Sequence, residues 1–164
     1  MGTEIERKFL VRNEGWQAGV VGGPDRLIQG YIKTPDDGVS EVRVRIIEPS
    51  EGQAHANIAI KSVGGLSRTE VEVPVDLEQA YQLLALCNGV VVNKTRYRVP
   101  TLYGLTFEID VYAEQLAGLV TVDCEVPTED TVIPTPEWLG EEITGRLEFA
   151  NAIMAKQGLP FCNR

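Results

Sequence analysis

Apolar and polar residues alternate along most of this chain with the period of two that an extended strand imposes on its side chains. The alternating segments are short, rich in β-branched residues and separated by turn residues, which favours a largely antiparallel sheet. They predict eight strands, over residues 4–11, 26–34, 40–47, 56–62, 67–75, 93–99, 105–112 and 120–126. Gly64 and Gly65 supply the positive φ of a tight hairpin turn between the fourth and fifth strands.

A first helical pattern follows the fifth strand, over residues 76–89. It begins with Asp76 and Gln79 in a capping-box arrangement, and it ends at Asn88 and Gly89, which suit a left-handed cap. The pattern predicts one helix across this segment.

A second helical pattern occupies residues 135–158. Pro136 suits a first helical position and Gly158 suits a stop. The apolar stripe of this segment is most simply a packing face; it consists of Leu147, Ala150, Ile153 and Met154.

Within the strands, one face carries the charges and the other is apolar. The charged sets share parity on each strand: Glu4, Glu6 and Lys8; Arg43 and Arg45; Glu70 and Glu72; Lys94, Arg96 and Arg98; Glu108 and Asp110; Asp123 and Glu125. Two architectures satisfy this pattern. In one the charges face solvent, and in the other a closed barrel keeps the charges inside and its apolar face outside.

Three features favour the barrel. Like-signed charges stand side by side on single strands, where they repel one another and make poor surface pairs. Arginine supplies both charges of VRVR at residues 42–45, and its donor fork suits phosphate or carboxylate oxygens. Both predicted helices also need an apolar sheet face to cover. These features make a barrel with a charged interior plausible, and they leave both architectures open.

Composition limits the classes of partner. With 164 residues and 43% hydrophobic content the chain fits a single domain, residues 1–164. Its formal net charge of -9 argues against duplex nucleic acid and anionic membrane surfaces as partners. No apolar run approaches the length of a membrane span, and the charged strand begins at residue 4, so we expect a cytoplasmic protein without a signal peptide.

Cysteine and histidine supply no obvious chemistry. Cys87, Cys124 and Cys162 are odd in number and widely separated, which argues against a disulfide framework or a thiolate zinc site. His55 is the only histidine and lies in a polar stretch, where a loop or strand-end position is expected. A histidine-based triad or a histidine-rich metal site is therefore not expected.

Charges inside a tunnel must be paired or bind a ligand, because an unpaired buried ion is costly. Arginine and lysine rows suit a polyanion, and all-oxygen carboxylate sites suit Mg²⁺ or Mn²⁺ bridging to phosphate oxygens. The sequence has no GxxxxGK[ST] loop, so phosphate would be held by side chains. If the charges face inward, a polyphosphate with Mg²⁺ or Mn²⁺ would satisfy both the cations and the carboxylates.

The ordered segments EIERK, QGYI, VRVR, IKS with GGLSRTE, KTRY, FEID and DCE resemble the CYTH superfamily, also called triphosphate tunnel metalloenzymes, in its small bacterial members. The resemblance covers essentially the whole chain. It implies a closed antiparallel tunnel of about eight strands that acts on triphosphate groups with a divalent metal. With this resemblance we expect an α+β fold, in which a closed antiparallel eight-stranded tunnel has a charged interior and helices packed on its outside. Ile5 and Phe9 are then expected to pack outward beneath the helices.

The resemblance also implies roles for individual residues. Metal-binding carboxylates would be Glu4, Glu6, Asp110, Asp123 and Glu125. Phosphate would be held by Lys8, Arg43, Arg45, Lys61, Lys94 and Arg96. Glu70 and Glu72 would serve a second metal or position the attacking water, and Tyr31 with Lys61 would assist proton transfer.

The sequence departs from the family pattern at two places, and both affect the residue roles that the resemblance implies. Asp123 stands where the late acidic pair usually has a glutamate. The segment GRLEFANAI around Asn151 is poorer in basic residues than in close relatives, which leaves Arg146 as a substitute contact to the tunnel.

The leading hypothesis is metal-dependent hydrolysis of inorganic triphosphate to pyrophosphate and phosphate. The alternatives are adenylate cyclase, thiamine or nucleoside triphosphatase in the same tunnel, and a non-catalytic polyphosphate-binding module. The expected partner is a small polyanion, either triphosphate or a nucleoside triphosphate. Oligomeric state stays open, with a homodimer among the alternatives.

Overall fold

The computed structural model describes residues 2–33, 40–62 and 66–160, and it contains all eight predicted strands. In chain order the elements are β1 (Gly2–Val11), η1 (Glu14–Gly19), β2 (Asp25–Lys33), β3 (Glu41–Glu48), β4 (His55–Lys61), β5 (Ser67–Val75), α1 (Leu77–Leu84), β6 (Asn88–Pro100), β7 (Thr106–Tyr112), η3 (Glu114–Leu116), β8 (Val120–Glu125), β9 (Leu139–Glu142), η4 (Leu147–Phe149) and α2 (Asn151–Gln157). The predicted Gly64–Gly65 turn and Cys162 lie outside the described residues.

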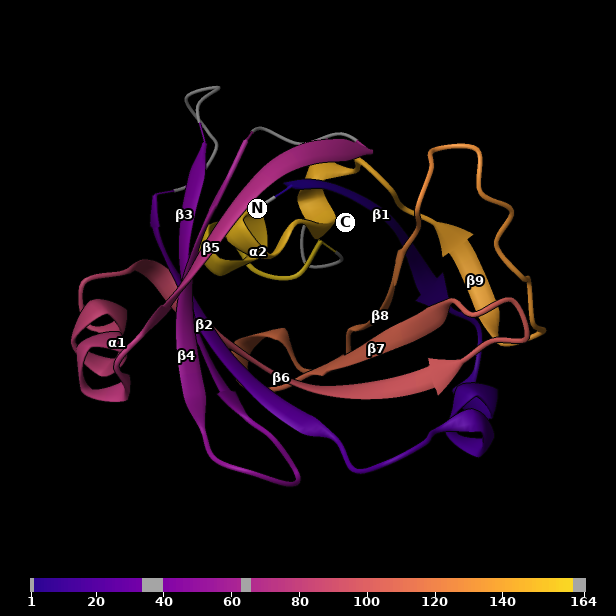
Figure 1. The fold of residues 1–164 in the computed structure, drawn as a ribbon, viewed down its shortest axis with the longest axis horizontal. Coiled ribbons are helices and arrows are strands. Elements are labelled where there is room, and N and C mark those ends of the chain that lie inside the picture. The colour runs from indigo at the N-terminus through magenta and orange to yellow at the C-terminus, as the bar shows by residue number, and fades with distance from the viewer. Residues whose placement is uncertain (1, 34–39, 63–65, 161–164) are drawn as a thin grey trace.

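The eight predicted strands close into an antiparallel barrel, seen as a ring in Figure 1. The strand order is β5-β4-β3-β2-β6-β7-β8-β1, and pairing between β1 and β5 joins the ends. One edge of β1 pairs with β8 over Glu6–Leu10. Its other edge is shared, because β5 pairs with the first residues of β1 and β9 pairs with the last. The closed sheet therefore has one inner face and one outer face.

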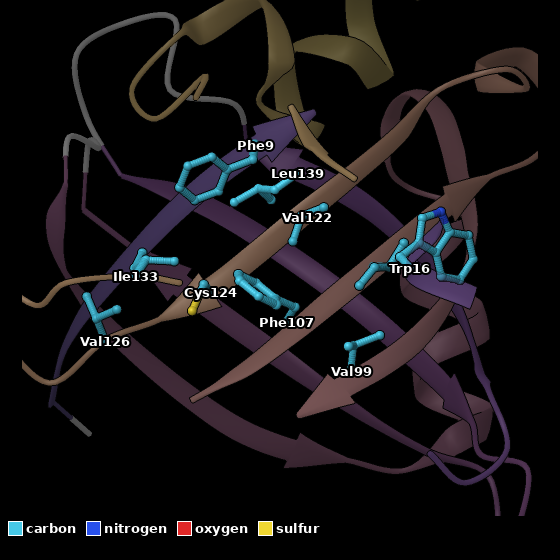
Figure 2. Close-up of a cluster of buried hydrophobic side chains, with 10 residues drawn as sticks. Phe9, Trp16, Val99, Phe107, Val122, Cys124, Val126, Ile133 and Leu139 are labelled. Atoms are coloured by element: carbon cyan, nitrogen blue, oxygen red, sulfur yellow. The ribbon is translucent and has the colours of Figure 1, made fainter. Parts of the chain in front are cut away.

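The outer face of β1, β7 and β8 carries the largest apolar cluster. Figure 2 shows its side chains, including Phe9, Phe107 and Val122, gathered on this face. The chain between β8 and β9 contributes Ile133, and η1 contributes Trp16. The sequence placed Ile5 and Phe9 beneath helices; this was wrong about the covering element, because an irregular segment and a short 3-10 helix pack against them.

Helix α1 packs on the outside of the barrel, as predicted. Ala80 of α1 is buried against Val44 and Ile46 of β3 in a second apolar cluster. Gly30 of β2 permits this close approach, since a Cβ there would lie 2.6 Å from the sulfur of Cys87. Outward packing of α1 leaves the inner face of these strands free for polar side chains.

Helix α2 does not pack on the outside, which corrects the prediction for the second helix. Its Ala152, Met154 and Ala155 are buried with Tyr31 and Tyr112, which lie on the inner face of β2 and β7. In Figure 1, α2 lies within the ring of strands. It therefore forms part of the cavity wall.

The first helix is shorter than its pattern predicted. Asp76 is the N-cap as expected, accepting a 2.9 Å hydrogen bond from the backbone N–H of Glu78, but the helix ends at Leu84. Asn88 and Gly89 begin β6 instead of capping the helix. Gly89 does have a positive φ of 75°, and a Cβ there would collide with the backbone oxygen of Ala155, so the glycine serves the contact between β6 and α2.

The second helical region was largely wrong. Residues 139–142 form strand β9, and only η4 and α2 are helical between residues 135 and 158. β9 forms because β1 offers an unpaired edge, and Gly140 fits there because a Cβ would lie 2.8 Å from the backbone oxygen of Leu10. Gly158 ends α2 as predicted, with a φ of 83°.

Within the described ranges, no helix has the length and apolar content needed to cross a membrane.

Cys87 is partly buried and Cys124 is fully buried, and both are free thiols. His55 is exposed at the start of β4, in agreement with the strand-end position expected for it.

Candidate functional site

The barrel encloses a cavity of about 500 Å³ whose wall is mostly charged. Of the chain's 15 lysines and arginines, eight line this cavity in the part that the structure describes: Lys8, Arg43, Arg45, Lys61, Arg68, Lys94, Arg96 and Arg146. Eight carboxylates line it too: Glu4, Glu6, Glu41, Glu70, Glu72, Glu108, Asp123 and Glu125. An inner face of this kind needs a polar ligand, because so many partly desolvated ions cannot all satisfy one another.

Carboxylates from β1, β7 and β8 converge on one part of the wall. The strand register places Glu6 beside Glu125, and Asp123 beside Glu108. Burial and the nearby Glu4 and Glu6 raise the pKa of Glu125 above its usual value. Burial and Glu6 likewise raise the pKa of Asp123. These side chains repel one another as anions, so a cation between them would lower their energy.

Behind this wall, β6 and β7 are joined by a buried ion-pair network around Asp110. Lys94 Nζ lies 2.6 Å from one Asp110 oxygen, and the Arg96 guanidinium donates to both oxygens at 2.7 and 2.9 Å. Burial alone would raise the pKa of Asp110, but Arg96 and Lys94 hold it well below its usual range. Asp110 is fully buried and does not line the cavity.

Lys94 is the most deeply buried of the inward lysines. Its burial, with Arg96 and Arg45 nearby, lowers its pKa to about 7 despite the opposing charge of Asp110. Lys8 shifts the other way: burial lowers its pKa, but Asp123 at 3.5 Å and other anions raise it above its usual value.

A second network joins β1, β3, β4 and β5. Lys61 Nζ lies 3.1 Å from Glu4 Oε2 and 3.6 Å from Glu70. The guanidinium of Arg43 lies 3.9 Å from Glu70 and 3.6 Å from Glu72. Both the cations and their carboxylate partners line the cavity, where an anion could replace part of this pairing.

A network centred on the amide of Gln29 occupies the wall formed by β2 and β3. Arg45 Nε donates to Gln29 Oε1 at 2.9 Å, and Gln29 Nε2 donates to the Tyr31 hydroxyl at 2.7 Å. Burial raises the pKa of Tyr31 to about 12, so this hydroxyl stays protonated at neutral pH. Burial, together with Arg43 and Arg96, lowers the pKa of Arg45 to about 10.

The segment after β9 closes the remaining wall. Arg146 pairs with Glu141 and Glu148, both at 2.9 Å, and its guanidinium stacks over Phe149. Asn151 of α2 accepts hydrogen bonds from Tyr112 at 2.7 Å and from Lys94 at 3.4 Å. Asn151 thereby fixes α2 to the inner face of the barrel.

Comparison with known proteins identifies the family. A model of the CYTH domain matches residues 2–153, which is nearly the whole chain. The chain belongs to the CYTH domain family. Its curated relatives include the inorganic triphosphatase of Nitrosomonas europaea, 39% identical over 93% of this chain and 97% of the relative. They also include the inorganic triphosphatase of Acetivibrio thermocellus, 33% identical over 95% of each chain.

Solved structures agree with this CYTH assignment. A crystal structure of an inorganic triphosphatase matches with a TM-score of 0.62 and 35% identity, over 94% of this chain and 95% of that chain. A protein of Pyrococcus horikoshii matches with a TM-score of 0.59 at 19% identity, over 77% of this chain and 80% of that chain, and supports the fold alone.

Most of the site residues predicted from sequence meet at this CYTH cavity. Its wall contains the metal candidates Glu4, Glu6, Asp123 and Glu125, the six phosphate candidates, and Tyr31, Glu70 and Glu72. Asp110 is the exception, because it lies behind Lys94 and Arg96. Tyr31 and Lys61 share no contact among the described residues: Tyr31 bonds to Gln29, and Lys61 pairs with Glu4 and Glu70.

Several residues that the structure brings to the site have no role predicted from the sequence. Arg68 lies 3.6 Å from Glu4, and Glu41 lies 3.9 Å from Arg68. Glu108 takes the cavity position that was expected of Asp110. Strand parity contained the signal for these three, because Arg68 has the parity of Glu70, Glu41 that of Arg43, and Glu108 that of Asp110.

The donor set fits a hard divalent cation, since it offers carboxylate oxygens and neither thiolates nor imidazoles. Asp123 Oδ1 is buried and accepts no hydrogen bond among the described residues, although Lys8 Nζ lies 3.5 Å away, so this oxygen has acceptor capacity that a cation could use. No group of three or more Asp, Glu, His or Cys side chains is already arranged as a metal site in the described part of the chain. Glu4 pairs with Lys61 and Arg68. Metal binding at Glu4 would therefore compete with these two cations.

Proposed function

We propose that this protein hydrolyses inorganic triphosphate to pyrophosphate and phosphate with the help of a divalent metal. One observation supports this most: cations and carboxylates line a single cavity together, in a CYTH domain whose curated relatives are inorganic triphosphatases at 39% and 33% identity. The products follow from attack of water on a terminal phosphorus, with pyrophosphate as the leaving group.

The substrate would be held by the inward cations. We assign this role to Lys8, Arg43, Arg45, Lys61, Lys94 and Arg96. Their side chains come from β1, β3, β4 and β6, so they can contact a linear polyanion from several directions. Fixed cations aimed at phosphate oxygens stabilise the charge that develops during transfer and need little reorganisation, which is how most such enzymes gain their rate.

The metal would be held by Glu4, Glu6, Asp123 and Glu125, with Glu108 beside them. Mg²⁺ and Mn²⁺ both suit these oxygens. When bound, the cation would offset negative charge on the reacting phosphate oxygens. We assign Asp110 a different role from the one expected from sequence. Its two oxygens are occupied by Lys94 and Arg96, so it acts as their buried counter-ion.

Attacking water would be positioned by Glu70 and Glu72. Glu72 is exposed, and Asn57 donates to one of its oxygens at 3.1 Å, so its position is fixed while it remains in contact with solvent. A carboxylate in this position can accept the water proton. Tyr31, whose pKa is raised, would donate a hydrogen bond to a phosphate oxygen, and Lys61 would bind phosphate.

Phosphate release from inorganic triphosphate, measured with Mg²⁺, Mn²⁺ and EDTA, tests the proposal. We expect release with at least one metal and none with EDTA; background release with both metals would contradict it. Glu6→Gln should lower the rate at least roughly 100-fold, because a metal ion contributes several kcal/mol. Glu48→Gln is the matched control, since Glu48 pairs with Arg26 at the surface, outside the cavity, and its loss should leave the rate unchanged.

The same assay separates the alternative functions. Trp16 and Trp138 pack against Tyr97 and Phe107 and do not line the cavity, so neither offers an aromatic clamp for thiamine or adenine. We expect triphosphate to be turned over faster than ATP or thiamine triphosphate. Formation of cyclic AMP from ATP would identify a cyclase instead. Binding of triphosphate that is independent of metal, without turnover, would identify a binding module.

A further inference from the structure

Gln29 is a fully buried amide at the centre of the β2 wall, and the proposed mechanism does not use it. It lies between two side chains that do line the cavity, Arg45 and Tyr31. Its oxygen accepts from Arg45 Nε at 2.9 Å and its nitrogen donates to the Tyr31 hydroxyl at 2.7 Å. Gln29 thus uses both ends of one amide to connect two inward groups.

The chemistry of the partners fixes which way this amide points. A guanidinium can only donate, so the oxygen of Gln29 must face Arg45 and the nitrogen must face Tyr31. Because the Tyr31 oxygen accepts from Gln29, its own hydrogen remains available to another acceptor. Arg45 uses only Nε in this contact, and among the described residues its two terminal nitrogens also remain available. One buried side chain therefore orients three donor groups, which are the Tyr31 hydroxyl and the two terminal nitrogens of Arg45.

Arg45 differs from the other cations that line the cavity. Among the described residues, each of the other seven has a carboxylate oxygen within 4.0 Å, whereas Arg45 has none. Arg45 is partly buried, and a partly desolvated cation without a counter-ion is costly unless an anion arrives. The neutral amide gives Arg45 a fixed orientation and leaves its charge uncompensated.

We propose that Gln29 is a positioning residue that holds Arg45 and Tyr31 as a preformed donor set for one phosphate group of the substrate. The inference rests on the proposed function. A glutamate in this place would orient Arg45 equally well but would neutralise it, and it would have no N–H for Tyr31. The amide is therefore required for binding an anion, whereas stability alone would favour a carboxylate.

The test is calorimetric binding of inorganic triphosphate in EDTA, where turnover does not interfere. Gln29→Met, which is nearly isosteric but makes no hydrogen bonds, should weaken binding roughly tenfold, the size of one charge-assisted hydrogen bond. Gln29→Glu should weaken it roughly 100-fold, because the new carboxylate competes with phosphate for Arg45. Asn93→Leu is the control: Asn93 accepts from Arg26 outside the cavity, and binding should stay within about twofold.

Stability separates positioning from a merely structural role. Gln29→Glu should unfold at the same or a higher urea concentration than the wild type while binding triphosphate more weakly, because the carboxylate pairs with a buried cation. Gln29→Met should raise KM more than it lowers kcat. In an Arg45→Met background, Gln29→Met should change affinity less than about threefold, since most of its effect passes through Arg45.

Two results would overturn this inference while leaving the proposed function intact. One is wild-type triphosphate affinity in Gln29→Glu. The other is a double variant in which the affinity losses of Gln29→Met and Arg45→Met multiply, as they would for two independent residues. If the methionine variant does not fold, the glutamate variant still decides. A wild-type protein that neither binds nor hydrolyses triphosphate overturns the proposed function, and this inference with it.

Discussion

Arg96 and Arg45 face the same cavity from strands on either side of β2, yet they are held in different ways. Arg96 forms a two-bond fork with the buried carboxylate of Asp110, at 2.7 and 2.9 Å. Arg45 forms a single hydrogen bond with the buried amide of Gln29. Although burial would lower the pKa of Arg96, Asp110 raises it well above its usual value, whereas burial lowers that of Arg45 to about 10.

The difference separates a cation whose charge is already balanced within the protein from one whose charge is not. Asp110 already balances the charge of Arg96, and it also balances Lys94, so removing it affects the protein even without substrate. Arg45 has no such partner, so its charge is available to an incoming anion. Four predictions test this comparison.

Asp110→Asn should have the largest effect. The substitution keeps the shape of the side chain but removes the carboxylate nearest to both cations. Among the described residues, Lys94 then has no carboxylate partner, and Arg96 keeps only its longer contacts to Glu108 at 3.3 Å and Asp123 at 3.4 Å. The loss of a buried partner typically costs about 3–5 kcal/mol. We expect urea unfolding to occur at a clearly lower concentration. A loss below about 1 kcal/mol would mean that Asp110 is not the central counter-ion of this wall.

Arg45→Met should act on binding more than on stability. Removal of an uncompensated cation should weaken metal-free triphosphate binding roughly 100-fold, or about 2.7 kcal/mol. Stability should change far less than in Asp110→Asn, because relief of a buried charge offsets the unpaired oxygen left on Gln29. Calorimetry and urea unfolding measure the two effects. The comparison fails if stability falls as much as in Asp110→Asn.

The stability difference between wild type and Asp110→Asn should depend on pH. The pKa of Asp110 is lower in the folded protein than the unfolded value of about 3.9, so its contribution is present above that value and is lost as pH falls toward the folded pKa. The difference should shrink by roughly 2–3 kcal/mol between pH 5 and pH 2. Unfolding curves at several pH values measure it, and a difference that stays constant would contradict the assignment.

Glu142→Gln should have the smallest effect. Arg7 and Glu142 form the same two-bond fork as Arg96 and Asp110, at 2.8 and 2.7 Å, but on the outer surface. Solvent screens such pairs, so the cost should be about 0.2–1 kcal/mol. Because geometry is matched and burial differs, this variant isolates the effect of burial. A loss as large as that of Asp110→Asn would show that geometry alone decides.

Strand positions were predictable because alternation is a local property. All eight predicted strands formed, and most inward charges followed from their parity. The helical segments were less predictable. Residues 139–142 contain a pattern compatible with a helix, but the unpaired edge of β1 supplies backbone partners that make them a strand. A glycine with a positive φ after a helical pattern suits a helix cap, so the sequence predicts that role for Gly89. Its close approach to Ala155, which is distant in the sequence, cannot be predicted from neighbouring residues.

The candidate site residues likewise include some that the sequence could predict and others that only the structure identifies. Parity placed Glu108 and Asp110 on one face of β7 and could not tell which would reach the lumen. Curvature of the closed sheet and the side chains of Lys94 and Arg96 cover Asp110 and leave Glu108 at the cavity. Gln29 begins the QGYI segment, but its role could not be predicted from the sequence, because the role of a neutral amide on a strand depends on its two partners.

The sequence by itself determined that each strand has one charged and one apolar face, since side-chain alternation depends only on neighbouring residues. Tertiary structure decided which face became the interior, because pairing of β1 with β5 closes the sheet around the charges. It also decided which cation is balanced by a carboxylate and which by an amide. Those pairings join residues on different strands, and only the register of the closed barrel brings them into contact.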